Sequence, residues 1–203
     1  MSVPRLRCEN VYTAAGGPLT LTVLAGECVA IRGPSGVGKS LLLRALADLD
    51  PHRGDIFLDG LPQTDCPPHV WRRQVAYVPA AAGWWAETVT EHFTDFAALS
   101  GDVRALGLTT ECGAWPVARL SSGERQRLSV LRAVELNASV LLLDEPTANL
   151  DPESALAVEN WLMAHKAVGS TLIWVTHDAS QAARVADRVF VLDHTGLREV
   201  PRG

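Results

Sequence analysis

The sequence predicts an α/β protein with a mainly parallel core sheet, an antiparallel N-terminal β subdomain and a short helical insertion. Strand-length apolar runs alternate with helical patterns through the second half of the chain, which is typical of a parallel sheet with crossover helices. The composition is that of an ordinary globular protein, with 47% apolar and 20% charged residues. A length of 203 residues favours one domain, which we assign to residues 1–203.

The first strands differ in pattern from the later ones. Residues 19–23 alternate apolar and polar side chains, and residues 54–60 predict a strand bracketed by turn residues. Alternation of this kind is typical of antiparallel strands with one solvated face. We therefore expect both segments in an antiparallel region beside the core.

The core elements follow from continuous aliphatic runs. Residues 27–32 predict a buried strand that enters a glycine-rich turn and then a helix at 41–47. Residues 140–143 are all aliphatic, as in a strand that is covered on both faces. The remaining expected elements are a helix from 152 to about 166, a strand at 171–175, a helix at 179–186 and a strand at 188–192. The insertion is expected at about 86–138, mostly helical up to residue 120 and followed by a helix at 124–137.

The turn after the first core strand fits the phosphate-binding pattern GxxxxGK[ST]. Its glycines let backbone N–H groups face phosphate oxygens, and the helix that begins near Lys39 adds its positive end. Lys39 is expected to reach the β- and γ-phosphates, and Ser40 to place its hydroxyl on Mg²⁺. The alternative is a purely structural glycine turn. The predicted nucleotide-binding residues are Gly33, Pro34, Ser35, Gly36, Val37, Gly38, Lys39, Ser40 and Leu41.

Two adjacent carboxylates, Asp144 and Glu145, end the aliphatic strand at 140–143. The carboxyl edge of a parallel sheet is where α/β proteins bind ligands. We expect Asp144 to hold Mg²⁺ and Glu145 to orient or deprotonate an attacking water. Alone, the pair could equally begin a helix, and the phosphate-binding loop is what favours a site.

Residues 120–127, Leu-Ser-Ser-Gly-Glu-Arg-Gln-Arg, resemble the LSGGQ signature of ATP-binding-cassette (ABC) ATPases. Residues 140–151 are similar to that family's Walker B and D-loop run, and residues 175–178 to its switch-histidine motif. The motifs occur in the family's order and span essentially the whole chain. The resemblance implies a P-loop NTPase fold, ATP and Mg²⁺ as cofactors, and a nucleotide-binding subunit of a bacterial type without a fused transmembrane domain.

The resemblance also implies that the chain pairs head to tail with a second copy or another ABC subunit. Ser121 and Gly123, with Ser122 and Glu124 between and beside them, then cover the γ-phosphate that Lys39 holds in the other subunit. Gly123 at the start of a helix also leaves backbone N–H groups free for an anion.

The implied catalytic residues are Glu145, His177 and Lys39. His177 is expected to contact both the γ-phosphate and Glu145, although a lone histidine is more often an incidental surface residue. Asp151 belongs to the D-loop in this resemblance, and it also caps the following helix, with Pro152 at the first helical position.

Three departures from the family pattern stand out. Ala80 occupies the position where the family usually has a glutamine that contacts Mg²⁺ and the attacking water. Ser122 replaces the first glycine of the signature pair. The aromatic residue that stacks on adenine is not evident: Tyr12 is the nearby candidate, but alignment puts Ala15 at the usual position.

The segment after Ala80 contains Trp84 and Trp85. In ABC ATPases this stretch lines the groove that receives a coupling helix from the transmembrane subunit. Neighbouring residues of an extended segment point to opposite faces, so at least one tryptophan should be exposed or bound to a partner. The alternative is local packing within the insertion.

The net charge of −5 argues against a nucleic-acid partner, because phosphate neutralisation needs clustered lysine and arginine. No apolar run approaches the ~20 residues of a membrane span, and the N-terminal residues do not resemble a secretory signal. We therefore expect a cytoplasmic protein, peripheral on the inner face of the cell membrane. Its cysteines have no metal-binding spacing and are expected to be reduced.

These observations predict an ABC-type ATPase that hydrolyses ATP as a head-to-tail dimer and drives transport through a separate transmembrane permease subunit. Two alternatives remain open. One is a soluble ABC ATPase with a regulatory or DNA-associated role. The other, which Ala80 favours, is a slow ATPase that acts as an ATP-gated dimerisation switch.

Overall fold

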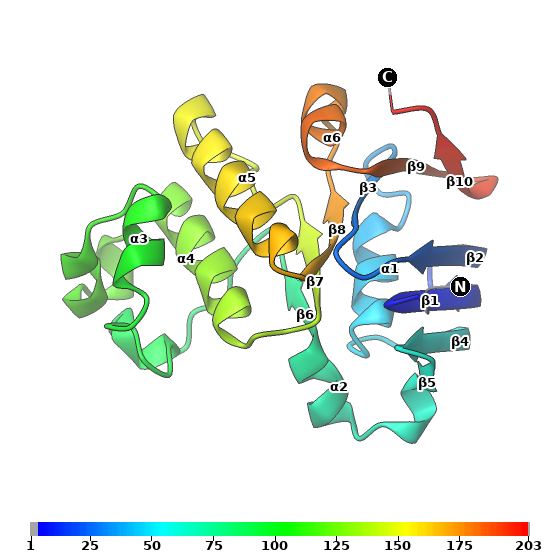
Figure 1. The fold of residues 1–203 in the computed structure, drawn as a ribbon, viewed down its shortest axis with the longest axis horizontal. Coiled ribbons are helices and arrows are strands. Elements are labelled where there is room, and N and C mark those ends of the chain that lie inside the picture. Colours follow the sequence, from blue (N-terminus) through cyan, green and yellow to red (C-terminus); the bar gives the residue numbers. More distant parts are fainter. Residues whose placement is uncertain (1–3, 203) are drawn as a thin grey trace.

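The computed structural model describes residues 4–202 and contains two sheets that pack around one helix (Figure 1). The smaller sheet is antiparallel, in the order β2-β1-β4-β5. Its strands are β1 (Leu6–Thr13), β2 (Gly16–Val23), β4 (Arg53–Leu58) and β5 (Leu61–Pro62). Helix α1 (Lys39–Leu46) buries Leu42, Leu43 and Leu46 in a core that both sheets share.

The larger sheet has the order β10-β9-β3-β8-β7-β6. All neighbours from β9 to β6 are parallel, and β10 is antiparallel to β9 at the edge. Its strands are β3 (Cys28–Arg32), β6 (Val75–Val78), β7 (Val140–Asp144), β8 (Thr171–Val175), β9 (Arg188–Asp193) and β10 (Gly196–Val200). Because β3, β8 and β7 are adjacent and parallel, the loops that follow them meet at one edge.

Helix α1 covers one face of this larger sheet, and further helices cover the opposite face. They are α3 (Ser100–Ala105), α4 (Ser122–Glu135), α5 (Pro152–Ala167) and α6 (Ala179–Val185), while α2 (Pro68–Gln74) leads into β6. In Figure 1, α3 and α4 lie at the end of the molecule away from the antiparallel sheet. Within residues 4–202, no helix combines the length and apolar character needed to cross a membrane.

The predicted fold class is confirmed, and most predicted core elements lie within two residues of the observed ones. The mostly helical character expected for 86–120 is confirmed only in part, because short helical segments alternate with turns there. That stretch contains α3 and three 3-10 segments, Thr90–His92, Thr110–Ala114 and Val117–Arg119. Gly107, at φ +68, follows the end of α3, and Thr88 and Pro116 form an isolated antiparallel bridge that draws the stretch into a compact loop.

The four cysteines, Cys8, Cys28, Cys66 and Cys112, are free thiols, as expected. Burial raises the pKa of Cys8 and of Cys28 to about 12. Since the thiolate is the reactive form, both side chains act as packing groups at neutral pH.

Candidate functional site

The phosphate-binding loop connects β3 to α1 and depends on glycine at two tight positions. Gly33 has φ +155, and a Cβ there would lie 2.2 Å from the backbone oxygen of Leu192. Gly38 has φ +105, and its Cβ would lie 2.5 Å from Cβ of Ala15. Any side chain at these positions would displace the neighbouring segments, so the loop path requires glycine.

Lys39 turns back over this loop. Its side chain is 7% exposed, and Nζ donates hydrogen bonds of 2.8 Å to the carbonyl oxygens of Gly33 and Pro34. Ser40 follows in the exposed first turn of α1. Gly38 is the N-cap and supplies no side-chain acceptor, so the N-terminus of α1 keeps backbone donors for an anion.

Asp144 ends β7 and is 4% exposed. Its Oδ2 accepts a hydrogen bond of 2.9 Å from the hydroxyl of Tyr77 on the neighbouring strand β6. Burial, with Asp144 as a second cause, raises the pKa of Tyr77 and keeps its phenol protonated. Sequence reasoning missed this role of Tyr77, because only the pairing of β6 with β7 brings the two side chains together.

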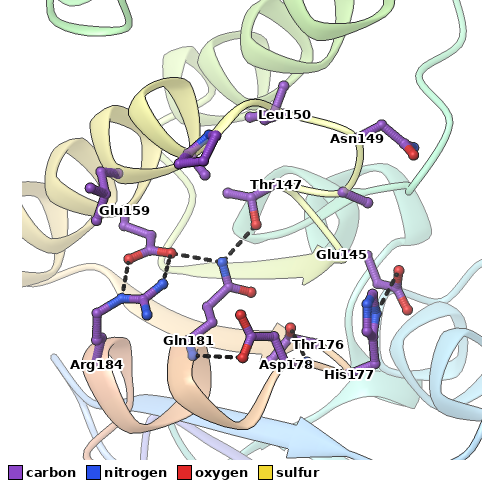
Figure 2. A pocket seen from close by; sticks show the side chains of 14 residues that line it. Glu145, Thr147, Asn149, Leu150, Glu159, Thr176, His177, Asp178, Gln181 and Arg184 are labelled. Carbon is purple, nitrogen blue, oxygen red and sulfur yellow. Dashed lines mark hydrogen bonds and ion pairs between the residues drawn. The ribbon is translucent and has the colours of Figure 1, made fainter.

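Glu145 and His177 come together at the same sheet edge (Figure 2). Nδ1 of His177 lies 3.4 Å from Oε2 of Glu145. Glu145 has an unusual φ of +48, and its N–H donates to the carbonyl of Val175 at the end of β8. The His177 side chain is 74% exposed, so the pair opens to solvent. This geometry supports the predicted pairing of a carboxylate with the switch histidine.

The residues present fit a magnesium ion held beside phosphate. Ser40 offers a hydroxyl and Asp144 a carboxylate, and hard oxygen donors are what Mg²⁺ prefers. Mg²⁺ is usually bound by one or two carboxylates, substrate phosphates and waters. A site of this kind does not need three His, Cys, Asp or Glu side chains close together. Residues 4–202 contain no such group of three.

The signature segment forms the N-terminus of α4. Oγ of Ser121 accepts from the N–H of Glu124 at 3.2 Å, and Oε2 of Glu124 accepts from the N–H of Ser121 at 2.8 Å. This capping box lowers the pKa of Glu124, with the Ser121 N–H as its main cause. Ser121 and Ser122 are exposed, and a Cβ on Gly123 would lie 3.2 Å from the Leu150 side chain in the D-loop. The segment thus presents small groups on the surface.

Asp151 caps α5 as expected. Its Oδ1 accepts a hydrogen bond of 2.9 Å from the N–H of Ser154, which is the main cause of its lowered pKa.

Tyr12 and Ala15 lie on different parts of the first hairpin. Tyr12 is 45% exposed and lines a groove together with Leu41 and His52. Ala15 lies against Gly38 of the phosphate-binding loop. The aromatic ring therefore borders a groove that includes the first turn of α1.

The two adjacent tryptophans behave as predicted, since Trp85 is 72% exposed and Trp84 is partly buried. The guanidinium of Arg132 lies 4.9 Å from the ring centre of Trp84 and 4.6 Å from that of Trp85. His92 anchors the segment, because its Nε2 accepts from the N–H groups of Trp85 and Ala86 at 3.0 Å each.

Comparison with known proteins decides the family. Residues 17–148 match the family model described as ABC transporter. The chain belongs to this family. The match confirms the resemblance predicted from the motifs, and it covers the phosphate-binding loop, the signature and Asp144–Glu145.

Two relatives illustrate the range of this family. The chain is 35% identical over 195 residues to the L-cystine import ATP-binding protein TcyN of Bacillus subtilis, covering 86% of this chain and 75% of that protein. It is 34% identical over 194 residues to the sulfate/thiosulfate import ATP-binding protein CysA of Synechococcus elongatus, covering 89% of this chain and 56% of that protein. The chain thus spans little more than half the length of the latter relative.

A solved structure described as the ATP binding subunit of an ABC transporter superposes with a TM-score of 0.86 at 27% identity, covering 96% of this chain and 89% of that chain. A dimeric ATP-binding cassette in a post-hydrolysis state with ADP and Pi superposes with a TM-score of 0.85 at 23% identity, covering 98% of this chain and 99% of that one. At 23% identity, the match to the dimeric ATP-binding cassette shows a shared fold and nothing more.

Proposed function

We propose that the chain is the ATP-binding subunit of an ABC transporter, which hydrolyses ATP in a head-to-tail dimer and drives transport through a separate membrane subunit. The observation that carries this proposal is the contact of Glu145 with His177 at the ends of β7 and β8, with β8 adjacent to the strand that leads into the loop of Lys39. The import proteins among the relatives support the transport role.

In this proposal the phosphates of ATP lie in the loop from Gly33 to Gly38, and Lys39 exchanges its two carbonyl partners for phosphate oxygens. Ser40 and Asp144 hold Mg²⁺, and Tyr77 orients the Asp144 carboxylate. When bound, Mg²⁺ supplies positive charge that offsets the charge developing on the phosphates. The ammonium group of Lys39 would thus complement the phosphate charge, and the oxygen donors of Ser40 and Asp144 the charge of the metal ion.

Glu145 is the proposed general base. Its carboxylate is 30% exposed and therefore accessible to a water molecule, and His177 lies on its solvent side. In this proposal the imidazole contacts the γ-phosphate while Glu145 takes a proton from the attacking water.

Tyr12 is the proposed adenine contact. Its exposed ring borders the groove beside Leu41, which follows the Mg²⁺-binding serine directly. Ala15, at the position where the family usually has an aromatic residue, has no ring to stack on a base.

The head-to-tail arrangement is testable by mixing two inactive variants. Lys39→Ala removes the phosphate contact, and Ser121→Arg blocks the small signature surface. Each homodimer carries one defect in both of its sites. A mixed dimer concentrates both defects in one site and leaves the other intact, so a 1:1 mixture is expected to regain about a quarter of wild-type ATP turnover. Phosphate release measures the rate, and a mixture that stays inactive would contradict the pairing.

The proposed partner surface surrounds Trp84 and Trp85. A nearby groove is lined by Leu49, Pro79 and Leu136, and all three are partly or largely exposed. Among residues 4–202, the buried Arg132 Nη1 has no hydrogen-bond partner. Aromatic and arginine side chains of this kind are favoured at interface hot spots, which supports docking of a membrane subunit here and a peripheral position on the inner face of the membrane.

Replacing Trp84 or Trp85 by alanine is expected to leave ATP binding intact and to weaken membrane association roughly 10-fold or more. Sedimentation with membranes that contain the transport partner measures the association. Trp115→Ala is the matched control, because Trp115 also stacks with an arginine, at 3.8 Å from Arg119. Unchanged association in both single variants and in the double variant would contradict the proposed surface.

Ala80 favours a second candidate function, a slow ATP-gated dimerisation switch. Alanine provides no amide for the metal or the attacking water. Wild-type turnover, measured together with ATP-dependent dimerisation by light scattering, separates the two functions: dimerisation with little phosphate release would indicate the switch.

A further inference from the structure

A polar network connects α5, α6 and the loop after Glu145 (Figure 2). Its centre is Glu159 on α5, which is 3% exposed. Arg184 of α6 donates to both carboxylate oxygens, from Nε at 3.0 Å and from Nη2 at 2.9 Å. Hydrogen bonding to Glu159 is the main cause of the raised pKa of Arg184, so the guanidinium stays charged beside the carboxyl group.

Gln181 of α6 joins this ion pair to the loop after Glu145. Its Nε2 donates to Oε1 of Glu159 at 2.8 Å and to Oγ1 of Thr147 at 2.7 Å. Both carboxyl oxygens of Glu159 accept hydrogen bonds from Arg184, and the amide of Gln181 turns its NH₂ group, which can only donate, toward Glu159. The same NH₂ group then has its second hydrogen directed at Thr147.

Both ends of this connection lead to the proposed catalytic pair. Thr147 lies two residues after Glu145, in a turn where the N–H of Ala148 donates to the Glu145 carbonyl at 3.0 Å. Gln181 lies in the first turn of α6, directly after His177 and the capping Asp178, whose Oδ1 accepts from the Gln181 N–H. The amide therefore spans from the helix behind the histidine to the turn behind the carboxylate.

We infer that Gln181 is a positioning residue that holds Glu145 and His177 at their working separation, and that the Glu159–Arg184 pair orients its amide. Glu145 needs such support, because its φ of +48 is rare for a residue other than glycine and persists only where its surroundings enforce it. The inference rests on the proposed ATPase function.

Gln181→Met tests the inference, since methionine keeps the side-chain length without the two hydrogen bonds. We expect kcat for ATP to fall roughly 10-fold while KM changes less than about 2-fold, because small displacements of reacting groups cost rate rather than ground-state binding. Thr147→Val is expected to have the same effect. Thr147→Ser keeps the hydroxyl and should retain nearly the wild-type kcat.

The double variant Gln181→Met with Thr147→Val is expected to be no slower than either single variant, as both remove the same contact. Glu27→Gln is the matched control, because it weakens a buried ion pair that lies away from the proposed site. Glu27 is also a buried carboxylate, 8% exposed, and pairs with Arg188 before β3 at the opposite edge of the sheet. Its loss should leave kcat unchanged.

A spectroscopic readout keeps the test independent of turnover. The NMR cross-peak of His177 Cε1–Hε1 is expected to move in Gln181→Met and Thr147→Val toward its position in Glu145→Gln, and to stay in place in Glu27→Gln. An unmoved cross-peak, or wild-type kcat in both network variants, overturns the inference. A wild-type protein that hydrolyses no ATP contradicts the proposed function instead, and the cross-peak then still decides the positioning role.

Discussion

Replacing Glu145 by glutamine is expected to lower ATP turnover by roughly 10²–10⁴-fold, the contribution typical of a general base. Glutamine keeps the shape of the side chain but cannot take a proton from water. The effect should fall on kcat, because ATP binding rests on Lys39 and the glycine-rich loop. Single-turnover phosphate release measures the chemical step directly.

The same substitution should lengthen the lifetime of the ATP-bound dimer, since the nucleotide that joins the subunits is no longer consumed. Light scattering with ATP and Mg²⁺ measures this population. Glu153→Gln is the matched control, as it removes an exposed carboxylate from the nearby first turn of α5. Equal turnover in Glu145→Gln and the wild type would contradict the general-base role.

Replacing Lys39 by alanine is expected to weaken ATP binding on the order of 10²-fold, because a charge-assisted hydrogen bond to phosphate is lost in a largely buried position. Hydrolysis should fall with it. Titration calorimetry with ATP and Mg²⁺ measures the affinity.

The control for this variant is Lys166→Ala, which removes the other lysine of the chain. Lys166 pairs with Asp187 at 2.6 Å, away from the phosphate-binding loop. Thermal melting of both variants checks that the fold is retained. Wild-type ATP affinity in Lys39→Ala would contradict the placement of the phosphates.

Much of the candidate site was predictable from the sequence, because its parts depend on local chemistry. The glycines before Lys39 are required by the loop itself, with positive φ at Gly33 and Gly38. The aliphatic run that ends in Asp144 is a strand wherever both faces of a parallel sheet are covered. Asp151 and Ser121 both cap the helices that follow them.

The stretch from 86 to 120 shows where local reasoning fails. The pattern predicts a mostly helical stretch, yet its apolar residues are buried by one six-residue α-helix, three 3-10 segments and the turns between them. Short apolar runs do not distinguish a helix from a folded loop, and tertiary packing overrides propensity there.

The α/β class, the phosphate-binding loop and the order of the motifs follow from the sequence alone, since each depends on residues that are neighbours in the chain. The distant residues that support them are known only from the folded structure. The contact of Tyr77 with Asp144 needs β6 to pair with β7, and that of Gln181 with Thr147 needs α6 to lie beside the loop after β7. Such side-chain contacts depend on strand order and helix packing, which no local pattern encodes.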